Sequence, residues 1–473
     1  MTSPHSALLA FCICIAGTTV TASPGSDASS QSTDISPPSA VSDGSQVGSA
    51  AGTADFSTID IPEAKQTPDA FRFKGTYVSG WSPSAARGIQ LNDSNTFPYL
   101  LPDTEPFEEG VYVWDAWPVR TPDGAVAVID DWVLMVGLSS ETDAGSDYPF
   151  YTRSTWRYWY TRDGNWIPGG VAFERTEALG SRQWAGSTIF DPDSNEITFY
   201  YTAVGALNAE SLEADDPPRA MSNSHPGAGR PNTEQRMAMV TASVSAGDTG
   251  VSFSDFGEHE MILEADGEIY VTEAAYIPGN VIYGMRDPHY WLDDETGREY
   301  ILFTANAAGM PDPFNGVVGL AEKIDGEWTL QRPIIAAPGV SSQLERPHVV
   351  VRDDGLYVFF STHSFTFADG LNGPEGLYGF YNADGDIRGT YTAMNGTGLV
   401  LGNPPAAPNQ TYSYLVLPDG KVMSYVNTPY GFADDPDSEK EFIGAPAPLV
   451  QIGMKEGQST LLAAPDTALS GSR

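Results

Sequence analysis

Three acidic residues stand beside aromatic or arginine residues, a setting that suits chemistry on a sugar. They are Asp115 in Val-Trp-Asp-Ala-Trp-Pro-Val (113–119), Asp287 in Met-Arg-Asp-Pro-His-Tyr (285–290) and Glu345 in Gln-Leu-Glu-Arg-Pro-His-Val (343–349). A retaining glycosyl transfer uses one carboxylate as nucleophile and a protonated one as acid, about 5 to 5.5 Å apart. A third carboxylate can hold neighbouring hydroxyls while positive charge develops on the ring. The three acids predict such a site, although each could instead cap a loop or form a structural ion pair.

Tryptophans accompany these acids. Trp114 and Trp117 flank Asp115, and Trp184 lies in a separate segment. Sugar rings present apolar C–H faces that pack on indoles, while their hydroxyls bind carboxylates and guanidinium groups. The residue types therefore favour a carbohydrate as the ligand.

The sequence lacks the residues that several other catalytic chemistries require. The six histidines show no spacing typical of a transition-metal site. The two cysteines, Cys12 and Cys14, lie in the apolar N-terminal run, so the rest of the chain has no thiol nucleophile and no disulfide. Neither a Gly-x-Ser-x-Gly motif nor a phosphate-binding glycine loop is present.

The residues that must position the site form short strands. Aromatic or β-branched runs alternate with Asp-Gly or Asn-Glu turns in segments 159–170, 189–203, 289–305, 320–331, 348–361 and 414–426. This alternation predicts successive β-hairpins. Helical periodicity is nearly absent, and the best helix candidate is short, around 209–214. An all-β fold follows, which could be a propeller, a large sandwich or a solenoid.

The N-terminal region predicts export. Residues 7–20 are apolar but too short to span a bilayer, and small residues follow them, so residues 1–22 are expected to be a secretory signal peptide. Residues 23–58 are rich in Ser, Asp, Pro and Gly and predict a disordered linker. The folded domain is expected over 59–473. We expect a secreted protein, either extracellular or periplasmic.

The charge of the chain is strongly negative. Acidic residues number 62 against 24 basic ones, which gives a formal net charge of -38. Such a surface repels phosphate backbones and anionic lipids, so neither nucleic acid nor a membrane surface is an expected partner. High acidity with few lysines is also typical of proteins that work in high salt, although an ordinary acidic secreted protein remains the alternative.

The charge leads to a prediction about stability. Folding concentrates like charges, and counterions screen their repulsion. We therefore expect the melting temperature to rise as sodium chloride increases from low to molar concentration, measured by calorimetry at constant pH. A melting temperature that stays flat or falls over this range would contradict a halophilic protein.

Five sequence blocks in order resemble one known family, glycoside hydrolase family 68, which contains levansucrases, inulosucrases and bacterial β-fructofuranosidases. Three blocks contain the acids described above. The fourth, Gln183-Trp184-Ala185-Gly186-Ser187, resembles a Glu-Trp-Ser-Gly-Ser block of the family, and the fifth, Gln410-Thr411-Tyr412-Ser413-Tyr414, resembles its late Thr-Tyr-Ser motif. The resemblance covers roughly residues 65 to 455 and is closest to the Gram-negative levansucrases.

The resemblance implies a fold and a set of roles. It implies a five-bladed β-propeller with a central axial pocket, in which Asp115 is the nucleophile, Asp287 the transition-state stabiliser and Glu345 the general acid/base. The remaining residues implied to contact substrate are Trp114, Trp184, Ala185, Arg286 and Arg346 around the fructosyl unit, and Gln343, His363 and Tyr412 on the glucosyl or acceptor side. The implied reaction releases glucose from sucrose and transfers fructose to a fructan or sugar acceptor, with some hydrolysis. The alternatives are a β-fructofuranosidase, an inulosucrase or, more distantly, a carbohydrate-binding propeller without catalysis.

Some positions depart from the family pattern. Ala185 replaces a serine beside the nucleophile, which suggests that one hydrogen bond orienting Asp115 is missing. Gln183 replaces a glutamate, and Thr304 stands where an acid is common. Ser342 stands where calcium-binding relatives carry aspartate, so we expect no structural calcium and no other metal or cofactor.

The implied acid/base role places a demand on Glu345. It must hold a proton near neutral pH to protonate the departing glucose. We expect two anionic neighbours to supply this by raising its pKa.

Overall fold

The computed structural model describes residues 70–100, 107–142, 154–205, 234–272, 283–310, 313–428 and 442–462. The predicted signal peptide, the predicted linker and the helix candidate at 209–214 lie outside these residues. Within them, strands dominate, and no helix has the length and apolar character needed to cross a bilayer.

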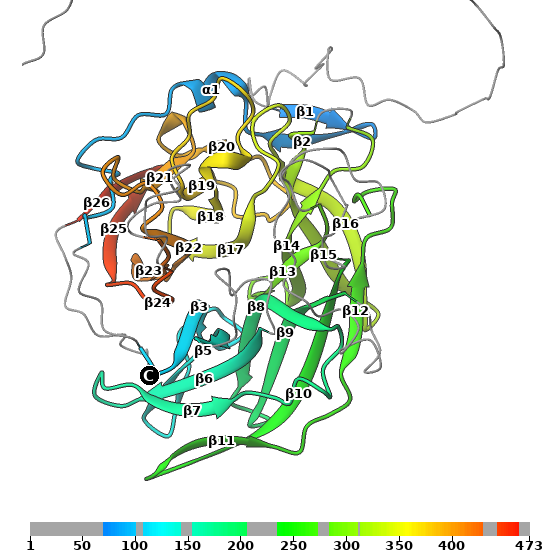
Figure 1. The fold of residues 1–473 in the computed structure, drawn as a ribbon. Helices are drawn as coiled ribbons and strands as arrows, with labels where there is room; N and C mark the ends of the chain where they lie inside the picture. Colours follow the sequence, from blue (N-terminus) through cyan, green and yellow to red (C-terminus); the bar gives the residue numbers. More distant parts are fainter. Residues whose placement is uncertain are drawn as a thin grey trace, which may run out of the picture. The chain divides into compact units, whose positions relative to one another are not determined.

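Five antiparallel sheets follow one another along the chain and form the blades of a propeller, so the predicted fold is confirmed (Figure 1). Blade I contains β3 (Val111–Pro118), β5 (Trp132–Glu141), β6 (Thr155–Thr161) and β7 (Ile167–Val171), with β4 (Val128–Ile129) paired to β5. Blade II contains β8 (Arg182–Asp191), β9 (Glu196–Val204), β10 (Gln235–Gly247) and β11 (Gly250–Ser254), with β12 (Glu260–Glu264) paired to β10.

The other three blades repeat this plan. Blade III contains β13 (Arg286–Asp293), β14 (Arg298–Asn306), β15 (Gly316–Ile324) and β16 (Glu327–Ala336), and β2 (Thr76–Gly80) and β1 (Ala70–Phe73) extend it. Blade IV contains β17 (Glu345–Arg352), β18 (Gly355–Thr362), β19 (Gly376–Asn382), β20 (Thr392–Ala393) and β21 (Leu399–Gly402). Blade V contains β22 (Thr411–Val416), β23 (Lys421–Val426), β24 (Ala445–Pro446), β25 (Val450–Lys455) and β26 (Gln458–Leu461).

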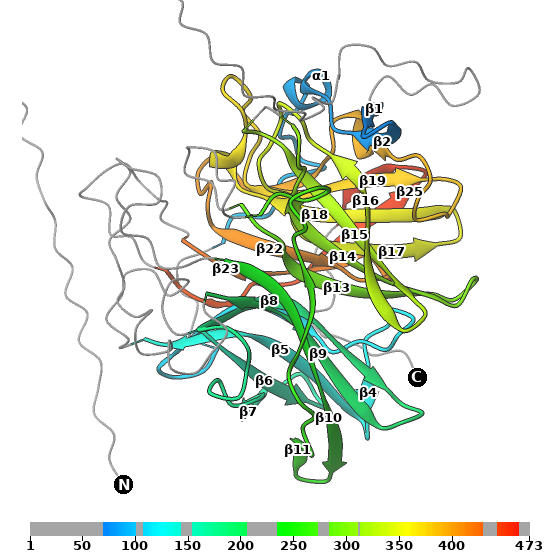
Figure 2. The ribbon, with the colours of Figure 1, turned by 90° about the vertical axis from the view of Figure 1, so that its right-hand side faces the viewer.

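The first strand of each blade lies innermost. Contacts run from β3 to β8, then to β13, β17 and β22, and from β22 back to β3, so these five strands close a ring around the axis (Figure 1). A view turned by 90° shows the β10–β11 hairpin extending away from this ring (Figure 2). The ring brings residues from five distant parts of the sequence to one place.

The turns that the sequence predicts are present. Asp325 and Gly326 join β15 to β16 with φ angles of 52° and 89°, and Asn195, at φ 59°, joins β8 to β9. Aspartate, asparagine and glycine tolerate this left-handed backbone better than other residues, which explains their place in hairpin turns.

One short α-helix, α1 (Pro83–Arg87), lies within the described residues in addition to the 3-10 turns Ser364–Thr366 and Met394–Gly396, and it was not predicted from the sequence. Its first residue is a proline, and the Ser82 hydroxyl accepts a hydrogen bond from the Ala85 amide at 3.2 Å. Serine as N-cap followed by proline is a recognised helix start. The signal was therefore present, but the helix is too short to show periodicity.

Residues 70–100 form an N-terminal belt across several blades (Figures 1 and 2). β2 pairs in parallel with β16 of blade III. The fully buried Trp81 donates its indole N–H to the Thr397 carbonyl at 2.9 Å, and the Ser94 carbonyl accepts the Leu461 amide of blade V at 2.7 Å. The belt thus extends the sheet of blade III and ties it to blades IV and V.

Candidate active site

All five innermost strands carry a β-bulge at the same level. The register with the next strand shifts between Trp114 and Trp117, Trp184 and Ser187, Arg286 and His289, Glu345 and His348, and Tyr412 and Leu415. Bulges re-aim side chains and are common at barrel rims and active sites. The bulges therefore fix five equivalent pairs of positions around the axis.

Nearly all the predicted site residues occupy these pairs. The residues before the bulge are Trp114, Trp184, Arg286, Glu345 and Tyr412, and the first bulged residues are Asp115, Ala185, Asp287, Arg346 and Ser413. Only Gln343 and His363 among the predicted residues lie elsewhere. Asp115, Asp287, Arg346 and Ser413 have φ between 49° and 62°. Such backbone is costly for residues other than glycine and concentrates at functional sites.

Arg286 joins two of the acids. Its Nη2 atom lies 2.5 Å from Glu345 Oε1, and its Nε atom lies 3.7 Å from Asp287 Oδ2. The Arg286 side chain is only 4% exposed. Since a buried charge requires a partner, the arginine and the two acids hold one another in place.

Arg346 of blade IV joins the remaining acid, Asp115 of blade I, to residues of blades II, III and V. Its Nη1 atom lies 3.8 Å from Asp115 Oδ1, and its guanidinium donates to the Ser413 hydroxyl at 2.9 Å and to the Gly186 carbonyl at 3.0 Å. Its backbone amide donates to Asp287 Oδ2 at 3.2 Å. One residue thus positions both predicted aspartates.

Trp117 differs from the sequence-based expectation. The Arg346 guanidinium lies 3.5 Å from the centre of its ring, and the edges of His289 and His348 contact it. The side chain is buried below the site. Trp117 therefore supports Arg346 through a cation–π contact instead of packing against a sugar.

The two predicted substrate-contacting tryptophans differ in exposure. Trp114 is buried and meets Phe442 edge-on, with ring centres 6.2 Å apart. Trp184 is partly exposed, and its carbonyl accepts the Trp156 indole N–H at 3.3 Å. Trp184 therefore offers the more accessible indole surface.

Ala185 contributes only its backbone, but a different hydroxyl reaches the nucleophile candidate. The Ala185 carbonyl accepts the Thr202 hydroxyl at 2.8 Å, and that hydroxyl oxygen accepts the Asp287 amide at 2.9 Å. Ser413 hydrogen-bonds the Asp115 carboxylate, while its oxygen accepts from Arg346. Asp115 therefore has a hydroxyl partner from blade V although Ala185 offers none. Ser413 was not among the predicted site residues, although it follows Tyr412 as Asp115 follows Trp114.

The other departures have structural consequences of their own. Thr304 on β14 donates to Asp287 Oδ2 at 2.8 Å and accepts the Arg346 amide at 3.1 Å, so a neutral hydroxyl stabilises the charged aspartate where an acid would repel it. The Gln183 amide donates to the Gly180 carbonyl at 3.2 Å. This hydrogen bond supports the loop before β8.

Gln343, a predicted site residue, is buried just before β17. Its backbone carbonyl accepts the Thr362 hydroxyl at 3.1 Å.

Three groups contact Glu345. Besides Arg286, the Tyr412 hydroxyl donates to Oε2, and His363 Nε2 lies 3.4 Å from the same oxygen. His363 stacks on Tyr412 with ring centres 3.7 Å apart, and its Nδ1 atom lies 2.9 Å from Glu375 Oε2. Sequence analysis missed Glu375, because one acid among 62 carries no local signal of burial.

Burial and charge set the ionisation of the two aspartates. Burial raises the pKa of Asp115, although Arg346 and the Ser413 hydroxyl act in the opposite direction. Burial also raises the pKa of Asp287 to about 6, despite the neighbouring Arg286. Perturbed carboxylates of this kind are typical of active sites.

The prediction that Glu345 has a raised pKa is wrong for the site without substrate. Burial alone would raise its pKa, but Arg286, His363 and the Tyr412 hydroxyl together lower it below its ordinary value. The predicted anionic neighbours are present but weaker than the donors in direct contact. Glu345 is therefore a carboxylate before substrate binds.

The Ser342 position is occupied by a hydrogen-bonded core residue. Ser342 is fully buried, and its hydroxyl donates to the Thr366 carbonyl at 3.3 Å. Within the part of the chain that the structure describes, no three His, Cys, Asp or Glu side chains form a group able to hold a metal ion.

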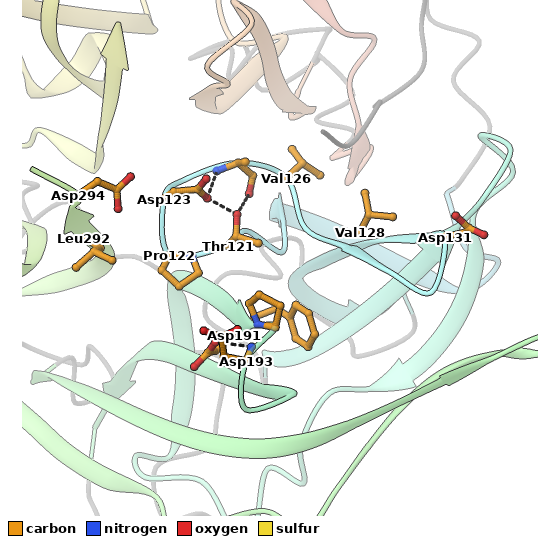
Figure 3. A pocket seen from close by; sticks show the side chains of 13 residues that line it. Thr121, Pro122, Asp123, Val126, Val128, Asp131, Asp191, Asp193, Leu292 and Asp294 are labelled. Atoms are coloured by element: carbon orange, nitrogen blue, oxygen red, sulfur yellow. Dashed lines mark hydrogen bonds between the residues drawn. The ribbon is translucent and has the colours of Figure 1, made fainter. Parts of the chain in front are cut away.

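A separate cleft of about 750 Å³ lies where β3, β8 and β13 end (Figure 3). The turn with Thr121 and Asp123 faces Asp191 and Asp193, with Asp294 to one side (Figure 3). Asp123 and Asp191 hydrogen-bond within their own turns. The cleft contains none of the predicted site residues: those on β3, β8 and β13 lie several residues earlier, and the others belong to blades IV and V.

The chain matches the family model described as Levansucrase/Invertase, glycoside hydrolase family 68, over residues 54–315 and 312–467. It belongs to this family. Levansucrase LscA of Pseudomonas savastanoi pv. glycinea is 33% identical over 426 residues, covering 80% of this chain and 93% of that protein. A levansucrase of Rahnella aquatilis is 32% identical with the same coverage. The solved structure of an inulosucrase from Halalkalicoccus jeotgali bound to kestose is 33% identical, with a TM-score of 0.70, covering 81% of this chain and 95% of that one.

Family membership confirms the resemblance inferred from the five blocks. The levansucrases of Pseudomonas and Rahnella are Gram-negative-type relatives, as the resemblance implied. The solved relative supports the propeller fold.

Proposed function

We propose that the protein is a levansucrase-type sucrose fructosyltransferase. The observation that carries the proposal is the network in which Arg286 and Arg346 join Asp115, Asp287 and Glu345 at the bulges of three innermost strands. Membership in glycoside hydrolase family 68 and the names of the levansucrase relatives support it. Sucrose is the donor substrate, and fructan or smaller saccharides are the acceptors.

In the first step, Asp115 attacks the anomeric C2 of the fructosyl unit and forms a covalent intermediate. Its contacts with Arg346 and Ser413 hold the carboxylate ready for attack. Glu345 gives a proton to the departing glucose, and Asp287 binds fructosyl hydroxyls while the ring gains positive charge.

In the second step, an acceptor replaces glucose. Glu345 is now a carboxylate and removes the proton of the acceptor hydroxyl, which attacks C2 and releases Asp115. A sugar hydroxyl yields fructan or oligosaccharide, and water yields fructose. Gln343, His363 and Tyr412 are the residues assigned to the acceptor side.

A binding propeller without catalysis explains the site less well. Keeping three acids buried together costs folding free energy, as the raised pKa values of Asp115 and Asp287 indicate. Sugar binding alone needs only hydrogen-bonding groups. Catalysis accounts for this cost in folding free energy, because the charges then act on a reacting sugar.

Transfer is expected to exceed hydrolysis at high sucrose. Glucose counts every turnover, whereas free fructose counts only turnovers that end on water. A sugar acceptor can use the hydrogen-bonding groups of Gln343, His363 and Tyr412 on the assigned acceptor side, which favours transfer over hydrolysis. The Ser413 hydroxyl contacts the Asp115 carboxylate and helps to orient it. We therefore expect released glucose to exceed free fructose clearly, with polymer or short oligosaccharides making up the difference.

The measurement is a time course of both sugars over a range of sucrose concentrations. Linkage analysis of the product then separates levan from the inulin-type polymer of the alternative reaction. A glucose-to-fructose ratio near one at every concentration would show that the protein is a β-fructofuranosidase. Absence of both sugars would contradict the proposed function itself.

We also propose that the protein acts outside the cytoplasm. The apolar run at 7–20 and the small residues after it support export. N-terminal sequencing of the secreted protein tests this, and a mature chain beginning near Ser23 is the expected result.

A further inference from the structure

The imidazole of His363 bridges two carboxylates. Its Nδ1 atom lies 2.9 Å from Glu375 Oε2, and its Nε2 atom lies 3.4 Å from Glu345 Oε2. Glu345 is the proposed acid/base, whereas Glu375 lies just before β19 in another segment of blade IV. The geometry connects the reacting carboxylate to a second acid through a group that can carry a proton.

Glu375 is deeply buried. It is 1% exposed, and its other oxygen accepts only a long hydrogen bond, 3.4 Å, from the Asn427 amide. In the described ranges, His363 is its sole basic partner within 4 Å. A buried carboxylate without a positive partner is strongly disfavoured, so Glu375 favours the charged form of His363.

The ring of His363 is also fixed in orientation. It stacks on Tyr412 at 3.7 Å with an interplanar angle of 13°, and Phe365 covers it at 4.7 Å and 19°. Aromatic faces stabilise a cation between them. The charged groups acting on His363 are Glu375 before β19, Glu345 on β17, Asp115 on β3 and Arg286 on β13, and among them only Arg286 opposes the imidazolium.

We propose that Glu375 is a positioning residue that keeps His363 protonated and aimed at Glu345, so that His363 stores the proton used by the acid/base. This inference rests on the proposed function, because it explains how a carboxylate in the free site becomes the acid that glucose departure requires. It extends that function by assigning a role to a residue outside the substrate-contacting set.

The proton transfer balances within the pair. As sucrose binds, the N–H bond at His363 Nε2 breaks and an O–H bond forms on Glu345, leaving a neutral imidazole and a carboxylic acid. Glu345 then passes this proton to the glycosidic oxygen as the C2–O bond breaks. The electron pair of the C2–O bond stays with the oxygen of the departing glucose. In the second step Glu345 takes a proton from the acceptor and returns it to His363.

The charge state of His363 in the free enzyme follows from these contacts. Burial would lower its pKa, but Glu375 and Glu345 together raise it above the ordinary value. Replacement of Glu375 by glutamine removes the larger of the two favourable effects. The imidazolium should then be lost at neutral pH and restored at lower pH.

The first test is the pH dependence of kcat in Glu375→Gln. We expect kcat relative to wild type to fall about tenfold or more at pH 7.5, since lowering a pKa by one changes the protonated fraction about tenfold. The ratio of the variant kcat to the wild-type kcat should return toward one as pH falls toward 5. The change in KM should be smaller than the change in kcat. Glu375→Asp, which keeps the charge, should lose less. A loss that is equal at every pH, or no loss, would overturn the proposal.

The matched control is Glu322→Gln. Glu322 is also a largely buried glutamate, but it pairs with Arg388 and Arg298 away from the site. Its replacement should leave the pH dependence of kcat unchanged. If it shifts the profile as Glu375→Gln does, the effect belongs to the net charge and the proposal fails.

The second test does not depend on sucrose or on folding of the Glu375 variants. Nuclear magnetic resonance of wild-type protein with isotope-labelled histidine, assigned by comparison with His363→Gln, reports the pKa of His363 directly. A value above that of an ordinary histidine is expected, and a value below it would overturn the proposal. Failure of the proposed function would appear instead as wild-type protein that releases no glucose from sucrose.

Discussion

Replacing Asp115 by asparagine is expected to lower glucose release from sucrose by a factor of about a thousand or more, the usual scale for loss of a covalent nucleophile. The amide cannot attack C2. The backbone should remain intact, because asparagine tolerates the left-handed conformation at φ 49° as aspartate does. Glucose release and the melting temperature, measured on the same preparation, check both parts.

The matched control is Asp255→Asn. Asp255 is exposed and has a similar backbone, with φ 51°, but it follows β11 far from the bulges. It should keep wild-type activity. Residual activity of Asp115→Asn above about a thousandth of wild type, with the control unaffected, would show that another group is the nucleophile.

Replacing Asp287 by asparagine should give a loss of similar scale without a loss of stability at neutral pH. The charge that stabilises the developing positive ring disappears, so kcat falls. Asparagine can still accept the Thr304 hydroxyl and tolerates φ 62°. The folded variant has no carboxyl to ionise at position 287, so it should be at least as stable as wild type at pH 7.

The pH dependence of the difference in stability between Asp287→Asn and wild type gives a stricter test. The pKa of Asp287 rises from 3.8 to about 6 on folding. Its contribution to the free energy of unfolding is therefore fully present below about pH 4 and is lost as pH rises through about 6. A pKa difference of one between the folded and unfolded states corresponds to about 1.4 kcal/mol. Denaturant titrations should show the variant gaining stability relative to wild type between pH 4 and 6, and a relative loss over that interval would contradict the assigned environment of Asp287.

Much of the fold was accessible from sequence because its signals are local. The Asp325-Gly326 turn and the alternation around it specify a hairpin without reference to the rest of the chain. The number of blades was not accessible in this way, since no strict period repeats. It came from the resemblance carried by the motifs around Asp115, Asp287 and Glu345.

Within the site, sequence identified the residues better than it identified their states. Glu345 was expected to have a raised pKa, but Arg286 from the preceding blade reverses the direction of the change. Ser413 and Glu375 were missed for a related reason. Their importance comes from contacts with Asp115 and His363 on other segments, and such contacts leave no trace in the local pattern.

The N-terminal belt has a consequence for the order in which the chain folds. Trp81, Ser79 and Leu100 bond to residues more than 300 positions later. Contacts at such separation form late, because the loop between their ends must close first. The part of the belt that contacts blades IV and V is therefore synthesised first and secured last. Until these blades exist, Trp81 lacks the rings of Phe360 and Tyr378, and Phe97 lacks the ring of Tyr414. A chain truncated before Glu345 should therefore be an easy substrate for proteases even though its first three blades are complete.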